Sequence, residues 1–156
     1  MRETKAQQIF LGEVNISDLD IDVKSRDELP KLLLGLQYIY VNKEIRDEVF
    51  EILSKDLIKT DINNGRPGMH LWTIFCLGAV RLILNADYDR LHDLANKHIT
   101  IREMLGHGQF NDFYYKLQTI KDNVKLFTPE ILDKINKIVV ESGHVLLKKK
   151  KKSKQE

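Results

Sequence analysis

The sequence predicts an all-α fold: a compact multi-helix bundle with a helix-turn-helix-like segment. From residue 25 onward, apolar residues recur at intervals of three and four, which places them on one face of successive helices. Short stretches of capping and turn residues separate these segments, and helices joined by short loops pack as a bundle. With 42% hydrophobic residues among 156, the chain is able to bury the core of one domain.

The two ends of the chain lack this helical pattern. Residues 1–23 are expected to form an extended N-terminal arm, in which the partly alternating run from Ile9 to Val23 fits a short strand. Residues 24–147 form the predicted helical domain. Residues 148–156 carry six lysines and one glutamate, a composition typical of a disordered basic tail.

The first two helices are predicted from their caps and apolar stripes. Ser25, in a capping box, and Asp27 compete as the first N-cap, because Pro30 is tolerated best in a first turn. Asn42 is expected to cap the next helix. The apolar positions are Leu29, Leu32, Leu33, Leu36, Ile39 and Tyr40, then Ile45, Val49, Ile52, Leu53 and Leu57.

A loop of turn residues, 61–68, precedes a helix from about Met69 to Leu84 that is apolar on nearly all sides. Such a helix belongs at the centre of a bundle. The single Cys76 is expected to pack there, because one cysteine makes neither an internal disulfide nor a thiolate cluster.

Four further helices are predicted in the second half, each with its own start signal. They begin at the Asp87 cap, at a capping box from Thr100 to Glu103, at about Asn111 and at the Thr128-Pro129 pair. Gly106 is expected to end the second of these helices. Ile131, Ile135, Ile138 and Val139 should face inward in the last one.

Catalytic chemistry has weak support in this sequence. Asp87, Asp89 and Asp93 lie close together, as carboxylates that hold Mg²⁺ do, but a helix cap and ion pairs at helical spacing explain them better. His92 beside Asp89 or Asp93 resembles a base with its orienting group, yet no serine or cysteine nucleophile lies near it in sequence. We therefore expect no catalytic residue, no metal and no other cofactor.

DNA contact is the stronger candidate, on the helix from Asn111 to Phe127. Its apolar stripe, Phe110, Phe113, Leu117, Ile120 and Val124, should face the core. The opposite surface presents Tyr115, Lys116, Gln118, Thr119, Lys121 and Lys125, which are side-chain types that reach phosphates and base edges. A short helix, a glycine turn and then this helix resemble a helix-turn-helix, whose second helix reads the major groove. An ordinary solvated helix face is the alternative.

Arg66 and the tail are further candidates for phosphate contact. Arg66 lies in the loop before the apolar helix, where it either meets phosphate or pairs with an acid of the first half. The lysine tail adds non-specific DNA affinity, serves as an interdomain linker or marks a translation end after a truncation. The net charge is only +2, so charge alone does not identify a nucleic-acid binder.

No membrane contact is expected. The longest apolar run, near Leu71 to Leu84, contains Arg81 and is shorter than the roughly 20 residues that a span requires. The first residues are polar and lack the apolar core of a signal peptide. These features predict a cytoplasmic protein.

Three long segments carry a resemblance to a known family. They are SRDELPKLLLGLQYIYVNKEIRDEVFEIL, GRPGMHLWTIFCLGAVRLILNADYDRLHDLANKHITIREMLGH and LQTIKDNVKLFTPEILDKINKIVVESGH. Together they resemble the InsH-type N-terminal domain of insertion-sequence transposases, most closely the ISNCY group, over about Phe10 to Lys148. The resemblance implies a part in transposition, a form of DNA recombination, through binding double-stranded DNA at the element's terminal repeats.

In such transposases an RNase H-like domain follows, with three acids that bind two Mg²⁺ ions. No residue of this chain matches a catalytic acid, so we expect a truncated, non-catalytic fragment of the enzyme. Two other roles stay open. The front helices, Leu29 to Ile58, are acidic on the outside and fit pairing as a homodimer or with a full-length transposase. An inactive remnant of a truncated gene is the third interpretation.

Overall fold

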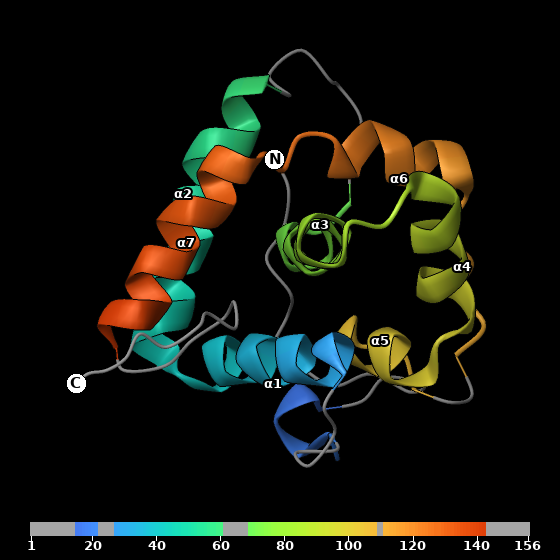
Figure 1. The fold of residues 1–156 in the computed structure, drawn as a ribbon, viewed down its shortest axis with the longest axis horizontal. Helices are drawn as coiled ribbons and strands as arrows, with labels where there is room; N and C mark the ends of the chain where they lie inside the picture. Colours follow the sequence, from blue (N-terminus) through green and yellow to red (C-terminus); the bar gives the residue numbers. More distant parts are fainter. Residues whose placement is uncertain (1–14, 22–26, 61–68, 109–110, 143–156) are drawn as a thin grey trace.

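The structure, a computed structural model, describes residues 15–21, 27–60, 69–108 and 111–142, with 58–60 described by their backbone only. Within these ranges the chain forms seven α-helices, one 3-10 turn and no β-strand, which confirms the all-α bundle (Figure 1). The elements are η1 (Ile16–Asp18), α1 (Glu28–Val41), α2 (Lys43–Thr60), α3 (Leu71–Leu84), α4 (Tyr88–Lys97), α5 (Ile99–Met104), α6 (Leu117–Val124) and α7 (Pro129–Glu141).

Helix α3 is the centre of the molecule. Figure 1 looks down its axis and shows the other helices arranged around it, and α1, α2, α4 and α6 all pack against it. Every residue from Leu71 to Val80 is buried. A helix that is apolar on all sides is stable only where neighbours cover each side, so the predicted central position is confirmed.

Aromatic rings fill the space between α3 and its neighbours on the side of α1 and α2. The Trp72 ring meets Tyr40, Phe50 and Phe75 with centroids 5.0, 6.2 and 5.6 Å away, and Phe75 meets Phe127 at 5.7 Å. These tilted and edge-on geometries are the favoured ones for ring pairs. The indole of Trp72 donates to the Met104 carbonyl at 2.8 Å, so this fully buried donor is satisfied.

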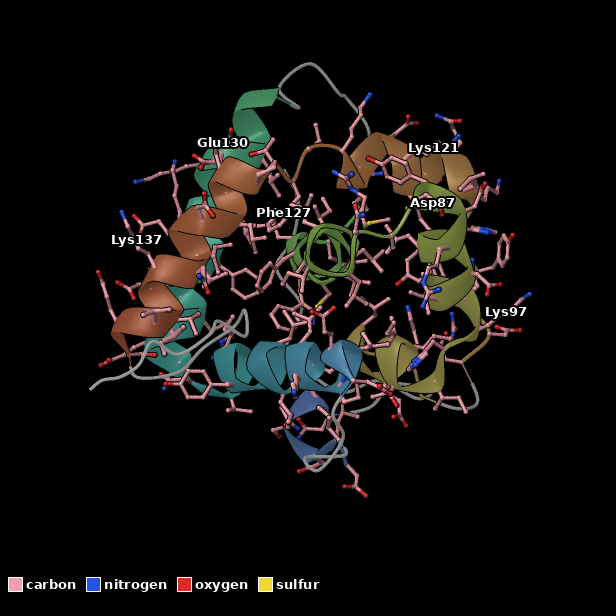
Figure 2. The ribbon with its side chains drawn as sticks, viewed as in Figure 1. Asp87, Lys97, Lys121, Phe127, Glu130 and Lys137 are labelled. Carbon is pink, nitrogen blue, oxygen red and sulfur yellow. The ribbon has the colours of Figure 1, made fainter. Side chains whose placement is uncertain are left out.

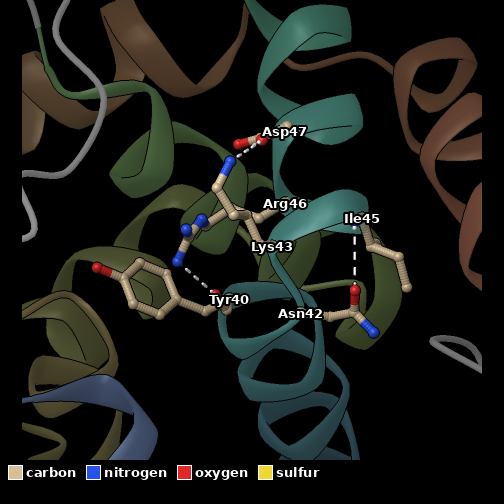
Figure 3. A network of polar contacts seen from close by, with 6 residues as sticks. All are labelled: Tyr40, Asn42, Lys43, Ile45, Arg46 and Asp47. Carbon is tan, nitrogen blue, oxygen red and sulfur yellow. Dashed lines mark hydrogen bonds and ion pairs between the residues drawn. The ribbon is translucent and has the colours of Figure 1, made fainter.

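The corner between α1 and α2 is held by polar contacts between residues close in the chain (Figure 3). The Asn42 side-chain oxygen accepts from the Ile45 amide at 3.5 Å, a long version of the predicted cap. Arg46 donates to the Tyr40 carbonyl at 2.8 Å, and its guanidinium lies 5.3 Å from the centroid of the Tyr40 ring. The arginine therefore closes the end of α1, where unpaired carbonyls and the helix dipole favour a cation.

Residues 15–21 of the predicted arm form a 3-10 turn and not a strand. The Asn15 side chain accepts from the Ser17 amide at 3.1 Å, which favours a tight turn. Ile16 is buried beside α1, and the amide of Gln37 donates to the carbonyls of Ile16 and Leu19, each at 3.1 Å. A buried contact with α1 therefore replaces the strand that we predicted.

Several predicted helix ends are confirmed. Asp87 caps α4 by accepting from the Arg90 amide at 2.8 Å, and Thr128 caps α7 by accepting from the Ile131 amide at 3.3 Å. Pro129 opens α7, as expected for a residue without an amide hydrogen. Gly106 follows α5 with a φ of 97°, a left-handed conformation that suits glycine.

The start of α5 differs from the prediction. Its cap is His98, whose Nδ1 accepts from the Ile101 amide at 3.2 Å, and Thr100 lies inside the first turn. A single histidine thus ends α4 and begins α5, which leaves Thr100 no capping role. The capping-box pattern does not include histidine, because a ring nitrogen is an uncommon cap, so the sequence did not indicate His98.

The remaining expectations concern the ends, one loop and the membrane. Ser25, the loop 61–68 with Arg66 and the tail 148–156 lie outside the described residues, as do residues 1–14 of the arm. Asp27 holds the N-cap position of α1, without a side-chain cap bond. None of the described helices combines the length and the apolar character needed to cross a bilayer.

Candidate nucleic-acid interface

Helix α6 is shorter than predicted and starts at Leu117 instead of about Asn111. Residues 111–116 are not helical, and side chains of α4 and α5 hold this segment in place. The Tyr115 amide donates to Asn96 Oδ1 at 2.7 Å, and Asn96 Nδ2 donates to the Tyr115 carbonyl at 2.9 Å. Arg102 donates to the Asn111 carbonyl at 3.0 Å. These bonds satisfy backbone groups that a helix would otherwise pair, so the helix begins later.

Two aromatic residues consequently exchange their predicted environments. Tyr115, predicted to face DNA, is only 6% exposed, and its hydroxyl lies 2.6 Å from Nε2 of His107. Burial raises the pKa of Tyr115 well above its ordinary value. Phe113, predicted to face the core, is 53% exposed. The helical period does not apply to a non-helical segment, so both assignments were wrong, and Tyr115 is removed from the candidate interface.

The remaining candidates on α6 do lie on the surface. Ile120 and Val124 are fully buried, as the apolar stripe predicted. The exposed residues are Lys116, Gln118, Thr119, Lys121 and Lys125, and Lys121 projects from the outer side of α6 in Figure 2. We call these five residues the α6 face.

A contact with Asp122, next to the α6 face, restrains the side chain of Gln118. The Gln118 amide donates to the Asp122 carboxylate at 2.8 Å, one turn further along the helix. On the inner side, buried Asn123 donates to the Thr119 carbonyl at 2.8 Å. The three lysines outnumber the single acid, so the α6 face is basic on balance.

The neighbouring helix α4 has the opposite balance. Its exposed acids are Asp87, Asp89 and Asp93, against Arg90 and Lys97. Asp93 pairs with Lys97 at 3.1 Å, in agreement with the ion-pair interpretation. A surface with excess carboxylate repels phosphate, so α4 is the poorer of the two for DNA.

The connection between α5 and α6 is too long for a helix-turn-helix. Residues 105–116 separate α5 from α6, whereas a helix-turn-helix has a turn of three or four residues. Between α3 and α4 there are only Asn85, Ala86 and Asp87, with Asn85 in the left-handed conformation at a φ of 54°. Helix α6 is therefore placed by the Asn96 and Arg102 contacts and by packing on α3 and α4.

The residues that the sequence analysis considered for a metal or catalytic site have structural roles. Asp87 is a helix cap, and His92 Nε2 lies 2.9 Å from the Tyr114 hydroxyl. Among the described residues, no group of three or more histidines, cysteines or acids is arranged to hold a metal ion. Cys76 is buried in the core as predicted, and burial raises the pKa of its thiol well above the ordinary value.

Sequence reasoning missed the network that positions the segment before α6. Asn96, Arg102 and His107 were not singled out, although each contacts residues 111–115. The only local signal was the cluster of aromatic residues at Phe113, Tyr114 and Tyr115. No protein-family model, curated protein or solved structure matches this chain.

Proposed function

We propose that this chain is a DNA-binding module of the type that opens insertion-sequence transposases, and that the α6 face contacts the duplex. The observation that carries the proposal is the α6 face itself. It is exposed and basic, it offers an amide and a hydroxyl group, and it belongs to a helix that packs on α3 and α4. Lysine contacts phosphate, whereas Gln118 and Thr119 offer hydrogen bonds to base edges. The terminal repeats of the encoding element are the proposed target.

The position of Lys116 supports the proposal. It is the N-cap residue of α6 and makes no side-chain cap bond, and the first turn of α6 contains no acid. A cation at a helix start is unfavourable by itself, because the dipole places partial positive charge there. A phosphate at this end would interact favourably with both the ammonium and the helix.

Salt dependence of binding tests the proposal. We expect the Lys121→Gln and Lys125→Gln double variant to weaken binding to a terminal-repeat duplex, measured by fluorescence anisotropy. The slope of log affinity against log salt should become shallower by roughly one for each lysine that contacts phosphate. Lys43→Gln is the matched control, because Lys43 is an exposed lysine on α2 that pairs with Asp47 at 2.8 Å.

Two outcomes would contradict the proposal. One is wild-type binding that does not respond to salt, and the other is an equal loss in the α6 and α2 variants. A shuffled duplex of the same composition tests the specific part separately. Equal affinity for both duplexes would show that the chain binds DNA non-specifically and does not recognise the repeats.

Self-association is the second candidate. It rests on two exposed valines, Val41 at 50% and Val140 at 47%, near the ends of α1 and α7. The Tyr38 and Ser142 hydroxyls, 3.0 Å apart, join these same two helix ends. Light scattering after size exclusion measures the mass of the particle, and a monomer at all protein concentrations would exclude this candidate.

A further inference from the structure

Two exposed aromatic residues lie next to the α6 face, at the surface of the molecule. Phe113 is 53% exposed and Tyr114 is 59% exposed, and both belong to the segment of residues 111–116. Lys116 follows them within three residues, a span of at most about 10 Å in an extended chain. Rings and a cation therefore lie within one short surface.

The orientation of both rings is set by neighbouring side chains. The His107 and Phe113 rings are stacked, with centroids 5.4 Å apart and an interplanar angle of 16°. Tyr115 contacts Phe113 edge-on at 4.8 Å. Tyr114 meets His92 edge-on at 5.5 Å, and its hydroxyl bonds to the same histidine. These contacts leave much of each ring accessible.

The backbone below the rings is fixed as well. Asn96 bonds to both the amide and the carbonyl of Tyr115, and Arg102 bonds to the Asn111 carbonyl. The Phe113 amide donates to Asn111 Oδ1 at 2.9 Å. Rings presented on a fixed backbone lose little conformational entropy when a ligand binds, which favours binding.

The chemistry of this surface favours a nucleobase as the ligand. The two adjacent exposed rings are flanked along the chain by exposed Asp112 and Lys116, so they do not form a continuous apolar groove for a protein helix. Stacking of a base on an aromatic ring beside a cation is how single strands are bound. The carboxylate of exposed Asp112 repels phosphate on one side, which leaves the side of Lys116 for the strand's backbone.

We propose that Phe113, assisted by Tyr114, stacks an unpaired nucleobase at the edge of a duplex held by the α6 face. The base would extend the His107–Phe113 stack by one layer. This proposal rests on the proposed function, because the α6 face supplies the duplex. It adds a preference for DNA in which a base next to the duplex is unpaired.

The experiment compares two probes with the full chain. One is a blunt 20-base-pair duplex, and the other is the same duplex with a short single-stranded extension that carries 2-aminopurine. We expect wild type to bind the extended probe more tightly and to change its 2-aminopurine fluorescence. Phe113→Ala should weaken binding to the extended probe by about five-fold or more, from the energy of one base–ring stack. Its affinity for the blunt duplex should change less than about two-fold.

Three further variants guard against indirect effects. Phe113→Tyr keeps the ring and should retain the preference. Asn96→Ala releases the Tyr115 backbone and should weaken the preference while both rings remain. Ile99→Ala removes an exposed apolar side chain of α5 and should change neither affinity. Thermal unfolding followed by circular dichroism identifies any variant that fails to fold.

The outcomes distinguish base stacking by Phe113 from duplex binding by the α6 face. Equal wild-type affinity for both probes, or an equal loss for both in Phe113→Ala, would overturn base stacking and leave duplex binding intact. A change of particle mass in Phe113→Ala would assign the rings to a protein contact and also overturn stacking. Absence of binding to the blunt duplex would instead remove the proposed function.

Discussion

Gly78 shows how closely the centre of the molecule is packed. A Cβ atom at this position would lie 2.5, 2.6 and 2.8 Å from Cδ2, Cγ and Cβ of Phe127. Figure 2 shows Phe127 between α3 and α7, in the direction of the central helix. Glycine in a helix interior is unfavourable by itself, so its presence here is explained by the approach of the ring.

Gly78→Ala is therefore expected to destabilise the fold. Overpacking in a core costs typically ~1–3 kcal/mol, and contact with rigid ring atoms favours the upper part of that range. Alanine gains only about 1 kcal/mol in helix propensity, so the clash should win. Urea unfolding measures the free energy of unfolding. In a Phe127→Leu background the same change should cost less, and an equal cost in both backgrounds would contradict this explanation.

At the scale of the element, the junction of α4 and α5 depends on the ionisation of one side chain. His98 accepts the Ile101 amide through Nδ1, which requires a neutral ring. Burial lowers the pKa of His98 below its ordinary value of 6.5. In the unfolded chain His98 takes up a proton near pH 6.5, whereas in the folded chain it does so only at lower pH. The neutral His98 side chain therefore contributes its full stabilisation of the fold above pH 6.5, and this contribution is lost as the pH falls below 6.5.

We expect the free energy of unfolding to fall as pH drops from 7 through 6.5 and below, and His98→Asn to reduce that fall. Asparagine also caps helices but does not titrate, so the variant isolates the ionisation from the cap. Urea unfolding of both proteins at several pH values gives the difference. Identical pH profiles for wild type and His98→Asn would show that another group is responsible.

At the scale of the whole molecule, the position of α3 makes Cys76 a probe of global opening. Helices lie around α3, and the thiol is buried with a raised pKa. Because helices cover this position, we expect that movement of a single surface loop does not expose it. Reaction of the thiol therefore requires that the bundle itself comes apart.

We expect a thiol reagent at pH 8 to label Cys76 on the order of a thousand-fold or more slowly than the unfolded chain, given ordinary domain stability. The rate should rise with urea in parallel with loss of circular dichroism. Above about pH 9 the unfolded thiol ionises while the buried one stays protonated, so stability should also decline there. Labelling in native buffer at the rate of a free thiol would contradict the central position of α3.

The sequence by itself determined the elements whose signals are local. The all-round apolar character of α3 predicted its central position, and the caps Asp87 and Thr128 predicted two helix starts, because caps act on amides within three residues. It also predicted the exposed lysines and the buried stripe of α6, since both follow the helical period.

Only the tertiary structure decided where α6 begins and which aromatic residues are exposed. Asn96 and Tyr115 are far apart in the chain, so no local pattern reveals that a side-chain amide binds the Tyr115 backbone. Once that backbone is paired outside a helix, the period of 3.6 residues no longer determines the side-chain directions. Tyr115 is buried and Phe113 exposed for this reason, because contacts between distant residues override a periodicity that holds only within a helix.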